Sequence, residues 1–352
     1  MRLVFMGTPE TAVPTLRRCL ADGHEVVAVW TQPDRPAGRG NKLSEPPVKD
    51  FALAHGLTVH QPAKIKTDEA RALFVSHEAD AAVVVAYGRI LPASFLNAPR
   101  RGCINVHFSL LPKYRGAAPV NWAIVRGETE TGVTTMRIDE GLDTGALYLQ
   151  RATPIGDAET APQVLARLAA LGAELLGETL ARLDELEPRP QREEEATHAP
   201  ILRREDGLID WRARAPEIDR RVRGFQPWPN AYTHFRGQRL VIHQSLPRNA
   251  PEEVSAPEEV DAPEEINAHN ESMDGAQGSR LARAAEIVEA HGDQLEIACG
   301  ERTRLRLSEV QLEGKRRMSA RDFINGMRVR AGERLGEEGA GEEGRGDGEV
   351  GR

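Results

Sequence analysis

The chain has 352 residues, of which 40% are apolar and 5% aromatic, and its formal net charge is −8. This length predicts about two domains, and no apolar run approaches the roughly 20 residues of a membrane-spanning helix, so we expect no membrane partner. The apolar run at Met1–Gly7 is too short for a signal peptide. Three widely spaced cysteines argue against a disulfide framework or a zinc cluster, so we expect a cytoplasmic protein.

The first half of the chain alternates strand-like and helix-like segments, which is the pattern of a mostly parallel α/β sheet. The first helix is expected to begin with Thr8 as N-cap and Pro9 at the first helical position, where no amide donor is needed. One or two helices over residues 161–186 close this domain, which we place at residues 1–187. The expected strands are Leu3–Met6, Glu25–Trp30, Ala82–Ala86, Cys103–His107 and Val133–Ile138.

After this domain the composition changes. Pro188-Arg189-Pro190 and the charged run that follows predict a linker over residues 188–203. Short strand candidates separated by turns then predict a small barrel or sandwich over residues 204–330, and this domain ends in a helix over Ser319–Val329 with Ser319 as cap. The expected strands are Leu208–Trp211, Tyr232–Phe235, Leu240–His243, Glu286–Glu289, Gln294–Ala298 and Thr303–Gln311.

Acidic residues concentrate in two segments. A Pro-Glu-Glu motif repeats with a period of six from Ala250, and residues 252–274 hold nine acids and no Lys or Arg. Such a composition buries too little apolar surface to offset the entropy of ordering, so we expect a disordered insertion at 250–278 and a disordered acidic tail at 331–352. Outside the insertion, residues 203–330 carry a net charge of +8. A basic domain suits a nucleic-acid partner, although a solvated basic face has the same composition.

Candidate catalytic residues lie at the ends of the predicted strands. The turn after the first strand has only one of the three glycines of a dinucleotide-binding loop, which disfavours that function. Asn105 and His107 lie two residues apart in a strand and point to the same face, about 6.6 Å apart along the chain. An amide donor beside an imidazole suits a carbonyl oxygen that becomes an oxyanion, and Asp143 on a Gly-rich loop could orient the imidazole. Spacing alone leaves open that these residues only cap a strand or satisfy the core.

Longer motifs point to a known family. Asn105-Val-His107, Ser109-Leu-Leu-Pro112 and Asp143-Thr-Gly145 resemble the active-site signature of the folate-dependent formyltransferases. Further stretches are similar to the methionyl-tRNA formyltransferase family within that group, and the resemblance runs from residue 2 to 330 outside the acidic insertion. These stretches are Thr31–Gly40, Val83–Gly88, Tyr114–Pro119 and Pro227–Pro229.

The resemblance implies an α/β fold, with a Rossmann-like formyltransferase domain followed by a small OB-like β-barrel domain. The formyl donor would be 10-formyltetrahydrofolate, the acceptor would be the α-amine of methionyl initiator tRNA, and no metal would be required. Asn105 and His107 would stabilise the oxygen of a tetrahedral intermediate, while Asp143 would orient His107 and assist proton transfer. The residues expected to line the folate pocket are Val85, Tyr87, Gly88, Ser109, Leu110, Leu111 and Pro112.

The resemblance also implies RNA contacts. In the family, a loop that corresponds to Pro33–Leu43 enters the acceptor-stem region and senses a weak first base pair, which assigns tRNA contacts to Arg35, Arg39 and Lys42. Its cations suit phosphates and its glycines suit ordering on RNA, although a flexible basic surface loop has the same composition. The +8 balance is a separate reason to expect the tRNA body on residues 204–330. We expect a monomer, since no additional apolar helix face is evident.

One residue departs from the family pattern, and two rival functions remain. The position between His107 and Ser109 is usually small, and here it is Phe108. Strand alternation predicts that Phe108 packs behind the catalytic face, whereas a kink would turn its ring into the folate pocket. The rivals are formyl transfer to a sugar nucleotide or another small amine, and an inactive folate- or RNA-binding module. The loop and the basic domain disfavour the first rival, and the intact catalytic residues disfavour the second.

Overall fold

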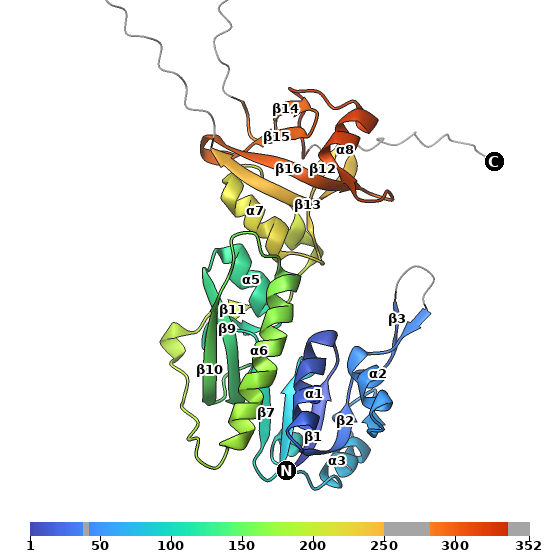
Figure 1. The fold of residues 1–352 in the computed structure, drawn as a ribbon, viewed down its shortest axis with the longest axis vertical. Coiled ribbons are helices and arrows are strands. Elements are labelled where there is room, and N and C mark those ends of the chain that lie inside the picture. The colour runs from blue at the N-terminus through green and yellow to red at the C-terminus, as the bar shows by residue number, and fades with distance from the viewer. Residues whose placement is uncertain (38–41, 250–281, 337–352) are drawn as a thin grey trace, which may run out of the picture. The chain divides into compact units, whose positions relative to one another are not determined.

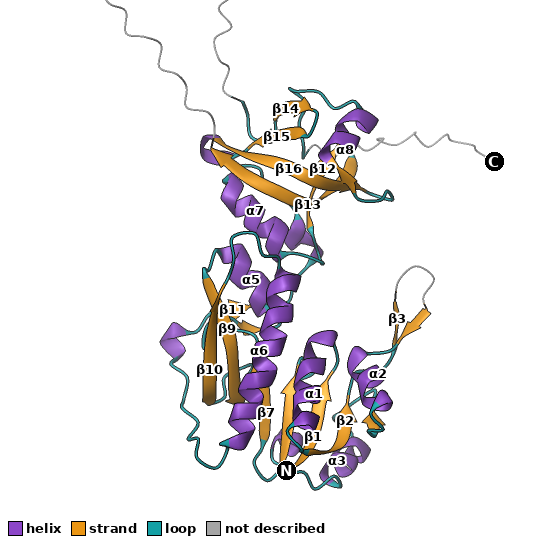
Figure 2. Ribbon diagram, in the orientation of Figure 1, coloured by secondary structure: helices purple, strands orange, loops and turns teal. Residues whose placement is uncertain are grey.

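A computed structural model describes residues 1–37, 42–249 and 282–336. The chain forms two compact units. The first unit comprises Met1–Asp206 and Arg223–Pro229, and the second comprises Gly207–Val222 and the chain from Asn230 onward. Figure 1 traces the chain and Figure 2 shows its helices and strands.

The first unit contains a seven-stranded sheet with the order β10-β9-β7-β6-β1-β2-β5. Strands β5, β2, β1, β6 and β7 run parallel, whereas β9 is antiparallel to β7 and β10 is antiparallel to β9. The predicted α/β fold with a mostly parallel sheet is confirmed. The strands are β1 (Arg2–Gly7), β2 (Glu25–Trp30), β5 (Val59–His60), β6 (Ala81–Val85), β7 (Cys103–His107), β9 (Glu130–Arg137) and β10 (Leu147–Pro154).

Helices cover both faces of this sheet because its central strands are apolar on both sides. Val83 and Val106 belong to a core cluster that includes α1 and the long helix α6, while Trp30 and Phe95 belong to a cluster that includes α3 and α4. The helices are α1 (Val13–Ala21), α2 (Pro47–Ala54), α3 (Asp68–Val75), α4 (Ala93–Leu96), α5 (Pro119–Arg126) and α6 (Ala161–Ala181), with a 3-10 turn at Glu10–Ala12 before α1.

The start of the first helix differs from the sequence prediction. Pro9, not Thr8, is the N-cap of the 3-10 turn. The Thr8 hydroxyl instead donates to the Tyr87 carbonyl at 3.2 Å and accepts from the Gln32 amide at 3.3 Å. Because the turns after β1, β2 and β6 lie together at the carboxyl edge of the sheet, the hydroxyl bonds to the neighbouring turns and does not cap its own helix.

The second unit is the predicted OB-like β domain. Its antiparallel sheet has the order β12-β13-β16-β15-β14, and β17 pairs with β16. Ser319 caps α8 as predicted, because its hydroxyl accepts from the Asp322 amide at 3.1 Å. The strand expected at Leu208–Trp211 is wrong: only one bridge, between Leu208 and Tyr232, forms there. The elements are α7 (Ala215–Gly224), β12 (Ala231–Phe235), β13 (Gln238–Asn249), β14 (Ile287–His291), β15 (Gln294–Ala298), β16 (Thr303–Leu312), β17 (Met318–Ser319) and α8 (Ala320–Met327).

The segments between and after the predicted domains carry specific contacts. Within residues 188–203, β11 (His198–Ala199) pairs with β8 (Arg115–Gly116), so much of the expected linker lies in the first unit. The tail was predicted to start at residue 331, but Leu335 is 3% exposed in the core of the second unit and its amide donates to the Ala285 carbonyl. The acidic insertion at 250–278 and the tail beyond residue 336 lie outside the described residues.

Two predictions about the chain as a whole concern its cysteines and membranes. All three cysteines are free and buried, and burial raises the pKa of each thiol to about 12, so each is held as a protonated thiol. No helix among the described residues has the length and apolarity needed to cross a membrane.

Candidate active site

Asn105 and His107 come from β7, an inner strand that pairs with β6 on one side and β9 on the other. Strand alternation turns Ile104 and Val106 into the core cluster beneath α1 and α6, so Asn105 and His107 point to the opposite face. The Asn105 side chain is half-buried, and its carboxamide has no hydrogen-bond partner among the described residues. A donor at the carboxyl end of an inner strand is thereby available to a ligand.

The His107 ring is held from one side. It is 6% exposed, and its Nε2 lies 2.9 Å from the Tyr114 carbonyl oxygen. Because a carbonyl only accepts, Nε2 carries the hydrogen of this bond. The other ring nitrogen, Nδ1, lies 3.7 Å from Oδ2 of Asp143, which is an ion-pair distance but too long for a direct hydrogen bond. Nδ1 is therefore the ring nitrogen left for a reacting group.

Asp143 sits on the loop between β9 and β10 in a left-handed conformation with a φ of 55°. Its Oδ2 accepts from the backbone N–H of Gly116 at 2.8 Å. The loop approaches β9 so closely that a Cβ at Gly145 would lie 1.7 Å from the Arg137 carbonyl, so only glycine fits there. The structure thus brings Asp143 to His107 from a loop far along the chain, and Asn105 lies two residues before His107 on the same face of β7.

The residues after β7 that were expected to bind folate direct most of their side chains into the protein. The Ser109 hydroxyl donates to the Lys113 carbonyl at 2.6 Å, and Leu111 is 2% exposed in a cluster with Met136 and Leu147. Leu110 is half-buried and packs so tightly on β9 that a Cβ at Gly132 would lie 2.5 Å from its Cδ2. Pro112, also half-buried, ends this segment.

The folate residues expected at the end of β6 and directly after it also divide into buried and exposed positions. Val85 and Tyr87 are buried, whereas Gly88 is exposed, has a φ of 82° and leaves open space where a Cβ would lie. Burial raises the pKa of Tyr87 to about 12, and its hydroxyl has no hydrogen-bond partner in the described part of the chain. Since β6 and β7 are adjacent parallel strands, the segments that follow them meet at the edge where α/β sheets bind ligands.

The predicted RNA loop contains two short paired strands. Strands β3 (Arg35–Ala37) and β4 (Lys42–Ser44) pair antiparallel, and the hairpin extends away from the sheet beside α2 (Figure 1). The Arg35 side chain is exposed. At the root, Asp34 accepts from Lys49 at 2.6 Å, and this bond lowers the pKa of the Asp34 carboxyl. Arg39 and the side chain of Lys42 lie outside the described residues.

Phe108 packs behind the catalytic face, as the strand alternation predicts. It is 7% exposed and belongs to the core cluster with Val106 and Val133. A Cβ at Gly172 of α6 would lie 3.5 Å from its ring, which places the ring against that helix. The ring is therefore part of the core on the face opposite to Asn105 and His107.

We predict that Phe108→Gly keeps the kcat and the folate KM of the wild type at temperatures where the variant is folded. Losing a buried aromatic ring should lower the free energy of unfolding by about 3–5 kcal/mol. Denaturant unfolding measures the loss of stability, and steady-state kinetics measures kcat and the folate KM. A tighter folate KM in the variant would instead place the ring in the pocket.

Several groups that hold this site were not nominated by the sequence. The Tyr114 carbonyl and the Gly116 amide are backbone groups, and both fall in a motif quoted above only for its family resemblance. Gln191, whose side chain reaches the Asp143 loop, falls in the expected linker. Among the described residues, no group of three or more His, Cys, Asp or Glu is placed to hold a metal ion.

Comparison with known proteins agrees with this architecture. The family model "Formyl transferase" matches residues 1–180, and "Formyl transferase, C-terminal domain" matches residues 201–328. Methionyl-tRNA formyltransferase of Koribacter versatilis is 49% identical over 96% of this chain and 99% of its own, and that of Acidobacterium capsulatum is 48% identical over 96% and 100%.

Two solved structures share the fold at low identity. An N-formyltransferase from Helicobacter canadensis, solved with folinic acid and dTDP-3-aminofucose, has a TM-score of 0.58 and 18% identity, covering 87% of this chain and 98% of its own. A sugar 3N-formyl transferase has a TM-score of 0.60 and 16% identity, covering 90% and 99%. The nearly full-length relatives are more specific than this shared fold: the chain belongs to the methionyl-tRNA formyltransferase family of formyl transferases.

Proposed function

We propose that the protein transfers a formyl group from 10-formyltetrahydrofolate to the α-amine of methionyl initiator tRNA. The observation that carries this proposal is the approach of Asp143 to His107 at the carboxyl edge of the sheet, with Asn105 on the same face of β7 two residues earlier. An unpartnered amide donor, a held imidazole and an anchored carboxylate form the set of groups that acyl transfer to an amine requires. The relatives at 49% and 48% identity support methionyl-tRNA as the acceptor.

In the proposed mechanism, the neutral amine attacks the formyl carbon and its oxygen becomes an oxyanion. The N–H of Asn105 donates to that oxygen. Because His107 uses Nε2 to donate to the Tyr114 carbonyl, its second donor is Nδ1–H, which exists when the ring is protonated. The intermediate collapses by breaking the bond from the formyl carbon to N10 of the folate, and N10 takes up the proton that the attacking amine loses.

Asp143 has two roles in this proposal. Its carboxylate faces Nδ1 at 3.7 Å and balances the charge of a protonated His107. The same carboxylate is the base nearest to the reacting centre, so it accepts the proton that leaves the attacking amine. The Gly116 amide, which donates to Oδ2 at 2.8 Å, keeps the carboxylate in place while it does so.

The folate donor would lie along the two segments that follow β6 and β7. We propose that these contribute chiefly through their backbones, because Val85, Tyr87, Ser109 and Leu111 turn their side chains into the protein. Gly88 fits this role, since the space beside its Cα is open and a ligand can approach closely. Leu110 and Pro112 complete the proposed folate contacts.

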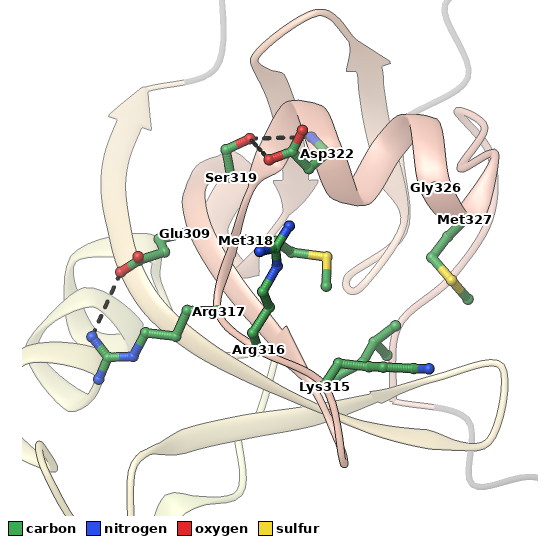
Figure 3. A pocket seen from close by; sticks show the side chains of 10 residues that line it. Glu309, Lys315, Arg316, Arg317, Met318, Ser319, Asp322, Gly326 and Met327 are labelled. Atoms are coloured by element: carbon green, nitrogen blue, oxygen red, sulfur yellow. Dashed lines mark hydrogen bonds and ion pairs between the residues drawn. The ribbon is translucent and has the colours of Figure 1, made fainter.

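For the RNA, we propose contacts on both units. On the first unit these are Arg35, Arg39 and Lys42 of the hairpin loop. The second unit has a pocket of about 560 Å³ whose lining includes Leu312, Met318 and Met327 and three successive cations at residues 315–317. Figure 3 shows Arg317 joined to Glu309, whereas Lys315 and Arg316 have no ion pair in the described part of the chain. Two uncompensated cations at one surface suit RNA phosphates.

Replacing both Lys315 and Arg316 by alanine should raise the KM for methionyl-tRNA and leave kcat unchanged, because phosphate contacts position the RNA without entering the chemistry. The slope of log KM against log salt should fall by about one for each lost contact. The matched control is Arg71→Ala with Arg100→Ala, which removes two exposed cations of the first unit. An equal change in the control would show a general charge effect.

Supplying one labelled formyl donor with alternative acceptors separates this function from its rivals. The proposal expects label on methionyl-tRNA and none on an amino-sugar nucleotide or on free methionine. Label on the sugar nucleotide alone would favour the small-amine rival, and folate or RNA binding without transfer would favour the inactive module.

We also propose that the protein is a cytoplasmic monomer with a catalytic domain at residues 1–187 and an OB-like tRNA-binding domain at 204–330. The three free, buried cysteines suit a reducing compartment. Residues 188–203 form an ordered extension of the catalytic domain, because they pair with it along β11 and at Arg189.

A further inference from the structure

Residues 189–199 connect the two loops that hold His107. At one end, the Arg189 amide donates to the Leu147 carbonyl at 2.9 Å, just beyond the Asp143 loop. At the other end, the Thr197 hydroxyl accepts from the Tyr114 amide at 2.9 Å, and the Thr197 carbonyl accepts from the Arg115 amide at 2.8 Å. The Asp143 loop supplies the carboxylate that faces Nδ1, and the Tyr114 loop supplies the carbonyl that holds Nε2. One segment therefore fixes the spacing of both groups.

The side chain of Gln191 is the main link from this segment to Asp143. Its Nε2 donates to the Asp143 carbonyl at 2.8 Å and to the Gly145 carbonyl at 2.8 Å. Its Oε1 accepts from Nε of Arg115 at 3.0 Å. The amide orientation is fixed by chemistry, because carbonyls only accept and a guanidinium only donates. Three of the four hydrogen-bonding positions of this carboxamide are directed at the loops of the site.

Arg115 links residues 189–199 to the carboxylate end of Asp143. Its side chain is buried, and its Nη1 lies 2.9 Å from both carboxylate oxygens of Glu193, two residues after Gln191. The next residue, Gly116, donates its backbone N–H to the Asp143 carboxylate. Asp143 is therefore held at both ends: Gln191 holds its carbonyl, and the residue that follows Arg115 holds its carboxylate.

The same segment explains why Gly116 has no side chain. Its φ is 120°, and a Cβ there would lie 2.5 Å from the Ala199 carbonyl oxygen. This close approach is where β8 and β11 pair. Asp143 is itself in a left-handed conformation, which a residue with a side chain keeps only when its surroundings hold it there.

We propose that Gln191 is a positioning residue for formyl transfer, acting together with Arg115. It holds the Asp143 loop in the left-handed conformation that keeps the carboxylate beside Nδ1 of His107. This inference rests on the proposed function in taking Asp143 as a catalytic residue. Gln191 touches neither the formyl group nor the amine, so its effect reaches the reaction only through Asp143.

The first test compares Gln191→Ala and Gln191→Glu with the wild type, at a temperature where all are folded. Both variants should lose kcat by on the order of 10- to 100-fold, with little change in KM for folate or tRNA, because a displacement of about 1 Å has costs of that size. Gln191→Glu keeps the size of the side chain but turns a carboxylate toward two carbonyls. Gln163→Ala removes an exposed glutamine that is hydrogen-bonded to Thr160 at the start of α6, and it should keep the wild-type kcat.

A double-mutant cycle tests the route of the effect. If Gln191 acts through Asp143, adding Gln191→Ala to Asp143→Asn should cost no further kcat. The proposal would be overturned if the double variant lost kcat by the product of the two single losses. It would also be overturned if Gln191→Ala and Gln191→Glu both kept the wild-type kcat. If Gln191→Ala does not fold, Gln191→Glu replaces it in the same double-mutant cycle.

Amide hydrogen exchange separates this inference from the proposed function. Without any substrate, the Gly116 amide should exchange faster in Gln191→Ala than in the wild type, while amides of α3 are unchanged. Unchanged exchange at Gly116 would overturn the positioning role even if the wild type transfers formyl. A wild type that transfers no formyl, with faster exchange in the variant, would contradict the proposed function and would leave Gln191 only as a residue that holds the Asp143 loop.

Discussion

Replacing Asn105 by alanine is expected to lower kcat for formyl transfer by about 100- to 1,000-fold, the usual effect of removing one oxyanion donor. The Asn105 carboxamide lies on β7, two residues before its carboxyl end, without a hydrogen-bond partner among the described residues, so its N–H groups are available to the formyl oxygen. The bond strengthens as that oxygen becomes charged, and its loss therefore appears in kcat more than in KM.

Two further variants make this result specific. Asn105→Asp keeps the shape but replaces the donor by a carboxylate, and it should be at least as slow as Asn105→Ala. Asn97→Ala removes an exposed asparagine at the end of α4 and should keep the wild-type kcat. Steady-state formylation with saturating substrates gives all three values. The wild-type kcat in Asn105→Ala would remove this side chain from the mechanism.

Asp143→Asn is expected to lower kcat by about 100- to 10,000-fold, the range for loss of a positioned proton acceptor. The amide can still accept from Gly116 and so keeps the loop in place, but it takes no proton from the amine. It also leaves a protonated His107 without the carboxylate that now lies 3.7 Å from Nδ1. The KM for either substrate should change little.

The control for this variant is Asp184→Asn, which removes an exposed carboxylate paired with Arg101. It should keep the wild-type kcat. Circular dichroism establishes that both variants are folded, so a slow Asp143→Asn reflects chemistry. Should Asp143→Asn retain full activity, the proton acceptor must be another group.

Much of the fold and of the candidate site can be predicted from local sequence patterns. Apolar runs such as Ala82–Ala86 predict central strands because both faces of those strands are covered. Asn105 and His107 are found together because a strand repeats every two residues. Phe108 follows from the same alternation, and the structure confirms its packing against α6.

What holds the site leaves no such pattern. The partner of His107 Nε2 is a backbone carbonyl, which every residue has, and Gln191 lies 48 residues from the Asp143 carbonyl that it holds. Residues 188–203 have the Pro-rich, charged composition of a linker because hydrogen bonds, not an apolar face, attach them to the sheet. The burial of Leu335 is also not predictable from the sequence, since a single leucine does not change the composition of a Gly- and Glu-rich stretch.

The central claim is formyl transfer to methionyl initiator tRNA. The most direct measurement follows labelled formyl from 10-formyltetrahydrofolate to that tRNA and, in parallel, to elongator methionyl-tRNA, with the full-length chain. We expect rapid formylation of the initiator and much slower formylation of the elongator. Equal rates on the two tRNAs, or no transfer to either, would contradict the account.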